Sequence, residues 1–167
     1  MPRQESSKVK TPEKALETLE WLCSKMERCV QDARRSLYRW GVVDRAVQDS
    51  IIEKLTRDGF IDERRYAAAY VRDKVLSGRW GESKIRYGLR AKGILEAVVE
   101  SAIAENLDKA SQSDKLYNAI YSHYQKEKGK TVDSYSLRAK LFRRAASRGF
   151  ELDEINSTIN KVIKDEE

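Results

Sequence analysis

The sequence predicts an all-α protein made of three tandem three-helix repeats in an elongated, curved arrangement. Three observations support this fold class. Only 2 prolines and 8 glycines interrupt the 167 residues, and these two residue types are the strongest breakers of regular structure. Apolar and polar residues do not alternate over any sustained stretch, so the period expected of strands is missing. Finally, one sequence pattern occurs three times along the chain, which is typical of repeat proteins.

The repeated pattern is a helical run that ends in a glycine followed by an apolar residue. It occurs at 33–42, 85–94 and 141–150. Glycine ends a helix at low cost because it adopts the left-handed conformation without a steric penalty. An aliphatic residue follows six positions after each glycine and an isoleucine ten positions after it, which places both on one face of a second helix. These residues are Val47, Val99, Ile155, Ile51, Ile103 and Ile159.

A third helix is expected to precede each of these helix pairs. In the first repeat it covers 12–25, with Thr11 as the N-cap and Pro12 in the first turn, where its missing N–H does no harm. Its inward face has helical spacing. That face consists of Ala15, Leu16, Leu19 and Leu22.

In the second and third repeats, the leading helices are expected over 63–76 and 114–126. Residues match between them at a constant offset of 51 positions, for example Tyr66 with Tyr117. The inward side chains are predicted to be Tyr66, Ala69, Tyr70 and Val71 in one helix and Leu116, Tyr117, Ile120, Tyr121 and Tyr124 in the other.

These repeats divide the chain into modules and tails. Modules are expected over 11–59, 60–109 and 110–163, and the tails 1–10 and 164–167 are expected to be frayed or disordered. A single module of this size buries only a small core. Neighbouring modules are therefore expected to stack, which in repeat proteins gives an elongated, curved molecule.

Charge is distributed unevenly along the chain. The sequence has 33 Lys and Arg against 27 Asp and Glu, a net charge of +6 and an isoelectric point near 9.3. Residues 64–92 hold 9 basic and 2 acidic residues, and residues 126–148 hold 8 and 2, whereas the rest of the chain holds 16 and 23. This concentration favours a polyanionic partner over the alternative, in which the charges form ordinary solvated helix faces.

The candidate residues for binding a partner or DNA are cations of these two blocks, together with one tryptophan. They are Arg64, Arg65, Arg72, Lys74, Arg79, Trp80, Lys84, Arg86, Arg90, Lys92, Arg138, Lys140, Arg143, Arg144 and Arg148. In the helix expected over 82–92, Ile85 and Leu89 face inward, so the cations face outward. An equivalent helix in the third module would extend them into one stripe, whose affinity depends on salt and needs no readout of base sequence.

Trp80 lies between two helices and among basic residues. One interpretation is that it packs into the core, because the area of a tryptophan dominates the packing of a small module. The alternative is that it stacks on a base or on a partner surface, with Arg79, Lys84 and Arg86 on phosphates. We favour packing, and the neighbouring charges stay available in either case.

No group of residues indicates catalysis. His123 is the only histidine, and it has no nucleophile or metal ligand beside it in the sequence. Phosphate-binding glycine motifs are missing, and Cys23 and Cys29 do not have the spacing of a metal motif. We therefore expect no enzyme activity, no metal and no cofactor.

The sequence also bears on the compartment. No apolar stretch approaches the length needed to span a bilayer, and residues 1–10 lack the apolar core of a signal peptide. Two free thiols are the ordinary state of cysteines in a reducing compartment. A cytoplasmic protein without membrane association is therefore expected.

Three linked motifs in the middle of the chain carry a family resemblance. They are Gly-Phe-Ile-Asp-Glu-Arg-Arg-Tyr-Ala at 59–67, Gly-x-x-Gly-x-x-Lys-Ile at 78–85 and Leu-x-x-Lys-Gly-Ile at 89–94. Together with Ala-Leu-x-x-Leu at 15–19, their order and spacing resemble the RecX family over about residues 12–163. The resemblance implies three tandem three-helix repeats, in agreement with the internal repeat.

The resemblance also implies a function. RecX proteins inhibit the RecA recombinase: they lodge in the helical groove of its filament on single-stranded DNA and lower ATP hydrolysis, strand exchange and co-protease activity. They need no cofactor. For this chain the resemblance implies a regulator of DNA repair, recombination and the SOS response. Its expected partners are the RecA filament and single-stranded DNA, contacted directly or through the filament, and the protein itself is expected to be a monomer.

Other functions stay open on the residues alone. A basic helical-repeat protein that binds nucleic acid without a recombinase partner would bind naked DNA or RNA equally well. A scaffold that binds only proteins would be insensitive to salt and DNA. An enzyme would require a catalytic constellation that the sequence does not display.

Overall fold

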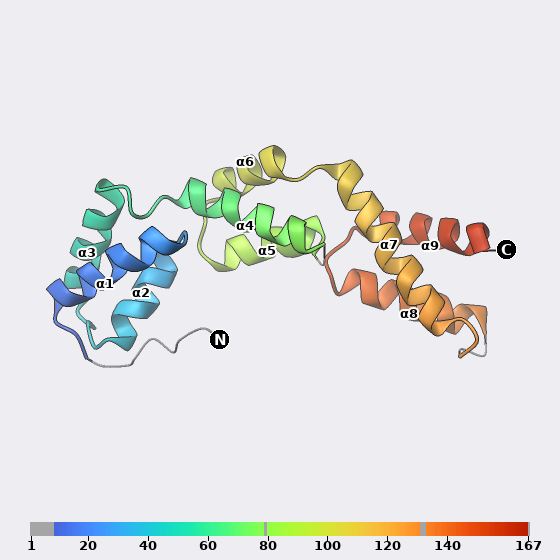
Figure 1. The fold of residues 1–167 in the computed structure, drawn as a ribbon, viewed down its shortest axis with the longest axis horizontal. Helices are drawn as coiled ribbons and strands as arrows, with labels where there is room; N and C mark the ends of the chain where they lie inside the picture. The colour runs from blue at the N-terminus through green and yellow to red at the C-terminus, as the bar shows by residue number, and fades with distance from the viewer. Residues whose placement is uncertain (1–8, 79, 131–132, 167) are drawn as a thin grey trace.

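The computed structural model describes residues 9–78, 80–130 and 133–166, and all regular secondary structure within them is helical (Figure 1). The helices are α1 (Pro12–Lys25), α2 (Val30–Arg39), α3 (Arg45–Arg57), α4 (Glu63–Ser77), α5 (Glu82–Ala91), α6 (Glu96–Asn106), α7 (Lys109–Glu127), α8 (Ser134–Ala146) and α9 (Leu152–Glu166). They group in threes around separate apolar clusters. The predicted all-α fold of three tandem three-helix modules is therefore confirmed.

The first module consists of α1, α2 and α3. Helix α1 begins where the sequence predicted, because the Thr11 hydroxyl accepts the Lys14 N–H at 3.3 Å and Pro12 occupies the first turn. In α3 the side chain of Asp44 accepts the Val47 N–H at 3.1 Å. The core between the helices includes Leu19, Leu37, Trp40, Ile51 and Leu55.

The second module consists of α4, α5 and α6. Helix α4 starts at a carboxylate cap, in which Asp62 accepts the N–H groups of Arg64 and Arg65. The cluster of this module includes Val71, Ile85, Leu89, Val99 and Ile103. The predicted inward face of α4 needs one correction: Ala67 is fully buried, whereas Ala69 and Tyr70 are only partly buried. Their rotation around the helix places them at the rim of the core.

The third module consists of α7, α8 and α9. Helix α7 begins at Lys109, earlier than the expected residue 114, because Asp108 caps it by accepting the Ser111 N–H at 2.9 Å. Helix α9 continues to Glu166, through residues that we expected to form a tail. Leu116, Ile120, Leu141, Ala145, Phe150, Ile155, Ile159 and Val162 form its core.

The turn glycines behave as the repeat predicted. Gly41, Gly93 and Gly149 have φ angles of 81°, 75° and 80°, in the left-handed region. The aliphatic residues that follow them enter the cores, although Val47 is only partly buried. The three copies of the sequence pattern therefore adopt the same turn and bury the same positions.

The modules follow one another in an elongated, curved row (Figure 1). The second helix of each module, α2, α5 and α8, lies toward the lower side of the row in that view. No described helix is both long and apolar enough to cross a bilayer.

Candidate polyanion-binding surface

Helices α8, α5 and α2 meet end to end, in that order. At the first junction the Gly81 N–H donates to the carbonyl of Arg148 at 2.8 Å, and the Ser83 N–H donates to the carbonyl of Gly149 at 3.2 Å. The first N–H groups of a helix have no partner within it. Here the turn that follows α8 supplies those partners, so the start of α5 is seated directly on the end of α8.

Glycine is required on both sides of this junction. A Cβ atom on Gly81 would lie 2.3 Å from the carbonyl oxygen of Gly149. A Cβ atom on Gly149 would lie 2.4 Å from the Cβ atom of Lys84. Two backbones approach each other here as closely as they can. Lys115 adds a side-chain link, because its Nζ donates to the Val75 carbonyl near the end of α4 at 2.5 Å.

The second junction, between α5 and α2, depends on charged side chains. Lys92 follows the end of α5, and its Nζ lies 2.6 Å from Oδ1 of Asp32 in the first turn of α2. Arg65 reaches Glu27 through two nitrogen–oxygen contacts of 2.8 and 3.3 Å. Burial raises the pKa of Asp32, but the hydrogen bonds from Lys92 and Cys29 outweigh burial and hold the pKa below its ordinary value. Asp32 is therefore charged at neutral pH.

Cys29 connects the first two modules through apolar packing. It precedes α2, yet it is fully buried in the cluster of the second module. Burial raises the pKa of its thiol, so the thiol is protonated at pH 7. Its Sγ lies 3.3 Å from Oδ2 of Asp32. Cys29 therefore contributes apolar packing between the first two modules.

Most of the predicted cations of the second module have partners within the protein. Arg86 pairs with Glu82, Glu96 and Glu100, and the hydrogen bonds to Glu82 and Glu100 raise its pKa. Arg90 pairs with Glu96 at 2.6 Å. Lys74 contacts Asp73, and Arg72 donates to Asn106. These side chains hold helices and turns together as well as carrying charge.

Trp80 packs, as we favoured from the sequence. It is partly buried against the second core, with its ring edge-on to Tyr70 at a centroid distance of 6.4 Å. The ammonium groups of Lys74 and Lys84 lie over its ring at 5.0 and 4.8 Å. Lys84 also donates to the Ser147 carbonyl at 3.2 Å, so it belongs to the α8–α5 junction. Arg79 lies outside the described residues.

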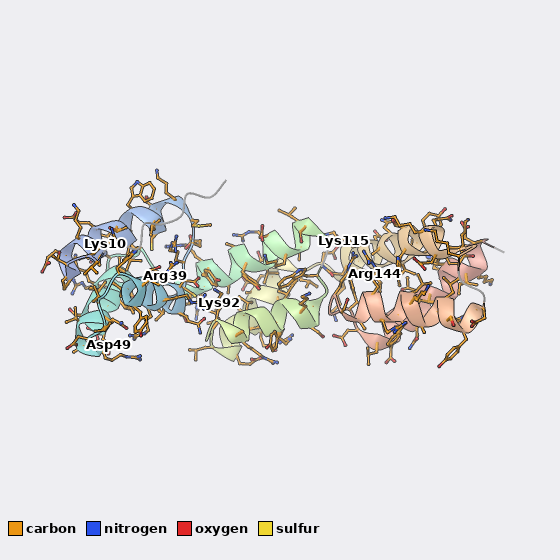
Figure 2. All side chains as sticks on the ribbon, turned by 90° about the horizontal axis from the view of Figure 1, so that it is seen from below. Lys10, Arg39, Asp49, Lys92, Lys115 and Arg144 are labelled. Carbon is orange, nitrogen blue, oxygen red and sulfur yellow. The ribbon has the colours of Figure 1, made fainter. Side chains whose placement is uncertain are left out.

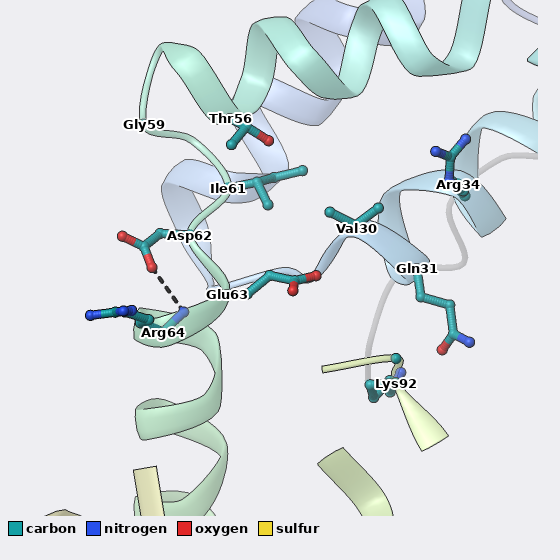
Figure 3. A pocket seen from close by; sticks show the side chains of 11 residues that line it. Val30, Gln31, Arg34, Thr56, Gly59, Ile61, Asp62, Glu63, Arg64 and Lys92 are labelled. Atoms are coloured by element: carbon teal, nitrogen blue, oxygen red, sulfur yellow. Dashed lines mark hydrogen bonds between the residues drawn. The ribbon is translucent and has the colours of Figure 1, made fainter. Parts of the chain in front are cut away.

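Arg64 borders a groove between the first two modules. The groove has a volume of about 750 Å³ and is lined by Val30, Gln31, Arg34, Thr56, Gly59, Ile61, Asp62, Glu63, Arg64, Lys92 and Gly93. In Figure 3, Glu63 reaches toward Val30, and the side chain of Arg64 points away from Glu63. No carboxylate partner of the exposed Arg64 guanidinium is found within the described residues, so it is available to an anion.

The third module also carries accessible cations. Arg143 and Arg144 are exposed on α8, and among the described residues neither is within ion-pair distance of a carboxylate. They border an open groove of about 440 Å³ that His123, Glu127, Lys140 and Ser147 complete. Burial and the Arg144 guanidinium lower the pKa of His123. The imidazole is therefore neutral at pH 7, and the arginines supply the positive charge.

The remaining predicted cations of the third module, Arg138 and Lys140 on α8 and Arg148 in the turn after it, also make contacts within the protein. Arg138 donates to Asn160 at 2.6 Å, and Lys140 pairs with Glu127 at 3.0 Å. The carbonyl of Arg148 accepts the Gly81 N–H at the helix junction. Viewed from below in Figure 2, Arg39, Lys92 and Arg144 follow one another along the length of the molecule, one in each module.

The sequence missed the contribution of the first module. Arg35 and Arg39 are exposed on α2, at the far end of the same row of helices. They were not predicted because acidic residues of the first module cancel their charge when charges are counted along the chain. The internal repeat could have identified them, because residues 33–42 align with the basic helices of the other two modules.

Fold and surface together define a class of protein: an all-α helical-repeat protein whose modules present cations along a row of end-to-end helices. Comparison with known proteins gives the family. The family model described as RecX, second three-helix domain, matches residues 62–103. A regulatory protein RecX of Clostridium beijerinckii is 31% identical over 120 residues, which are 72% of this chain and 55% of that protein. The chain thus spans little more than half the length of this relative.

A further relative extends the match over nearly the whole chain. A regulatory protein RecX of Clostridium perfringens strain 13 is 28% identical over 163 residues, which are 98% of this chain and 73% of that protein. The crystal structure of RecX from Lactobacillus salivarius has the same fold, with a TM-score of 0.74 at 19% identity, covering 90% of this chain and 96% of that one. A second crystal structure of a regulatory protein RecX gives a TM-score of 0.76 at 21% identity, covering 90% and 71%. The family model, the relatives and the solved structures together support the RecX family for this chain.

Proposed function

We propose that this protein binds RecA filaments on single-stranded DNA and inhibits RecA ATP hydrolysis, strand exchange and co-protease activity. Its relatives are named regulatory proteins. The structural observation that carries the proposal is the row of α8, α5 and α2, which presents cations from three successive modules. A long, curved, basic surface fits a long helical polyanion better than it fits a small molecule.

The cations of the proposed surface fall into two groups, those without a carboxylate partner among the described residues and those that pair with a carboxylate. Arg64, Arg143 and Arg144 have exposed guanidinium groups without a carboxylate partner in the described part of the chain. They are the proposed contacts to DNA phosphates or to acidic side chains of the filament. Arg65, Arg86 and Lys92 pair with carboxylates, and their main contribution is to fix the modules in the geometry that the filament recognises.

The other described cations that the sequence predicted are proposed to add to the positive potential of the protein. They are Arg72, Lys74, Lys84, Arg90, Arg138, Lys140 and Arg148. Regulation of this kind involves no reaction on the protein itself, so we propose neither an enzyme activity nor a cofactor. The protein would act as a monomer in the cytoplasm, where DNA repair and recombination take place.

The experiment is ATP hydrolysis by the RecA of the same organism on single-stranded DNA, with this protein titrated in. We expect inhibition at amounts well below the amount of RecA. The double variant Arg143→Glu and Arg144→Glu is expected to weaken inhibition at least ten-fold, because charged contacts to a polyanion are lost and two repulsive ones are added. Both residues are exposed, so the far-ultraviolet circular dichroism spectrum should not change.

A charge-matched control separates a specific surface from net charge. Lys109 and Lys164 are exposed outside the row of second helices, on α7 and α9. The double variant Lys109→Glu and Lys164→Glu removes the same charge and is expected to inhibit like the wild type. If the folded wild-type protein does not inhibit at all, the proposed function is wrong. The alternative would then be a basic helical-repeat protein that binds nucleic acid without a recombinase.

A further inference from the structure

Exposed aromatic rings are concentrated on the row of second helices. Among the described residues, Tyr38 is 68% exposed, Tyr87 is 73% exposed and Tyr135 is 82% exposed. These tyrosines lie on α2, α5 and α8, one in each module. None of the three contributes to a core cluster. Packing of the modules therefore does not explain why these positions are aromatic.

The repeat places tyrosine and arginine at the same two positions of these helices. The position six residues before the turn glycine is Arg35 in the first module, Tyr87 in the second and Arg143 in the third. The position three residues before the turn glycine is Tyr38 in the first module and Arg90 in the second. Residues three apart are neighbours on one face of a helix. Each of the first two helices thus presents one tyrosine beside one arginine on equivalent faces.

Tyr135 extends this face into the third module. Ala146 lies three residues before the turn glycine Gly149. Tyr135 lies 11 residues before Ala146. Eleven residues make about three turns of an α-helix, so both side chains project on the same side. Arg138 and Phe142 lie between them on that side, and the guanidinium of Arg138 contacts only the neutral Asn160 among the described partners.

The charges beside the rings are positive and accessible. Arg35 and Arg143 are exposed, and no carboxylate within the described residues is in ion-pair distance of either. Arg90 is exposed as well, although Glu96 partly neutralises it. Rings flanked by cations are complementary to a ligand that has flat faces and regularly spaced negative charges.

We propose that Tyr38, Tyr87 and Tyr135 form a stacking surface for the bases of single-stranded nucleic acid, with Arg35, Arg138 and Arg143 on its phosphates. The bases of a single strand expose their faces, whereas those of a duplex are covered by their neighbours. Stacking on aromatic side chains tolerates any base sequence. An acidic protein surface would use the cations but would not require an exposed ring on the second helix of each module. The inference deepens the proposed function, because it assigns a direct contact with the DNA strand to this surface.

The test is the dissociation constant for a fluorescently labelled 30-nucleotide thymidine strand, measured by anisotropy at several salt concentrations. The triple variant Tyr38→Ala, Tyr87→Ala and Tyr135→Ala is expected to bind roughly 100-fold more weakly, since each lost ring costs about five-fold or more. The slope of log affinity against log salt should stay the same, because the phosphate contacts remain. The triple variant to Phe keeps the rings and should bind like the wild type.

Trp21 provides the matched control. It is 59% exposed, but it lies on α1 and outside the row, so Trp21→Ala should bind like the wild type. The inference is overturned if the wild type does not bind the strand, if the triple Ala variant binds as well as the wild type, or if Trp21→Ala loses as much affinity. Inhibition of RecA ATP hydrolysis is measured on the same samples. A wild type that inhibits without binding the bare strand would refute only the stacking surface, whereas one that binds without inhibiting would refute only the recombinase partner.

Discussion

At the scale of single residues, charge in the sequence does not by itself identify a binding surface. Arg86 and Arg143 stand in comparable basic stretches, yet Arg86 is enclosed by three glutamates, whereas Arg143 contacts only a backbone carbonyl among its described partners. Only the pairing of Arg86 with Glu82, four residues away, follows from helix spacing. Glu96 and Glu100 reach Arg86 because the chain turns at Gly93, so the tertiary fold decides which cations remain accessible.

Gly149 gives a prediction at this scale. Both Gly149 and Gly93 are turn glycines in the left-handed region, but a Cβ atom on Gly93 meets nothing within 4 Å. Gly93→Ala should therefore cost about 1–2 kcal/mol of stability, from backbone strain alone. Gly149→Ala should cost about 1–3 kcal/mol more, because its Cβ atom also collides with Lys84 at the α8–α5 junction. Urea unfolding followed by circular dichroism measures both variants, and equal losses would show that the junction contributes nothing.

At the scale of helices, local signals predicted the elements well where apolar spacing and caps agree. The start of α1 follows from Thr11 and Pro12, and α4 begins directly after its cap Asp62. The start of α7 was placed too late, because the polar stretch 109–113 has no apolar period and only the carboxylate of Asp108 marks the true beginning. Elements can thus be predicted from periodicity, whereas their ends depend on single capping side chains.

Helix α6 offers a prediction about capping. Its N-cap is Leu95, which is 71% exposed and makes no side-chain cap. Serine at this position would accept a free N–H of the first turn, so Leu95→Ser should stabilise the protein by about 1 kcal/mol. For a protein of this size the melting temperature should rise by about 2–4 °C. Leu95→Ala removes the same side chain without adding a cap, and if both variants melt at one temperature the capping argument fails.

At the scale of the whole molecule, the internal repeat was sufficient to predict three modules in a row. Helices with the same spacing of apolar residues bury equivalent faces, so each copy of the repeat forms the same three-helix module. The way in which the modules connect could not be predicted. The α8–α5 junction joins backbone groups of Gly81 and Arg148, which are distant in sequence and have no side-chain signature apart from glycine. The first two modules are joined by two ion pairs, Lys92 with Asp32 at the α5–α2 junction and Arg65 on α4 with Glu27 before α2. The continuous row of second helices, and the contribution of the first module to it, are therefore known only from the structure.

The measurement that tests the central claim most directly is co-sedimentation with RecA filaments. The protein is mixed with RecA filaments on long single-stranded DNA, with the same DNA alone and with RecA alone, at one salt concentration. We predict that it sediments with the filaments at concentrations where binding to the bare DNA is weak, and that the double variant Arg143→Glu and Arg144→Glu stays in the supernatant. Equal binding to bare DNA and to filaments would contradict the claim that this row of helices recognises a recombinase filament.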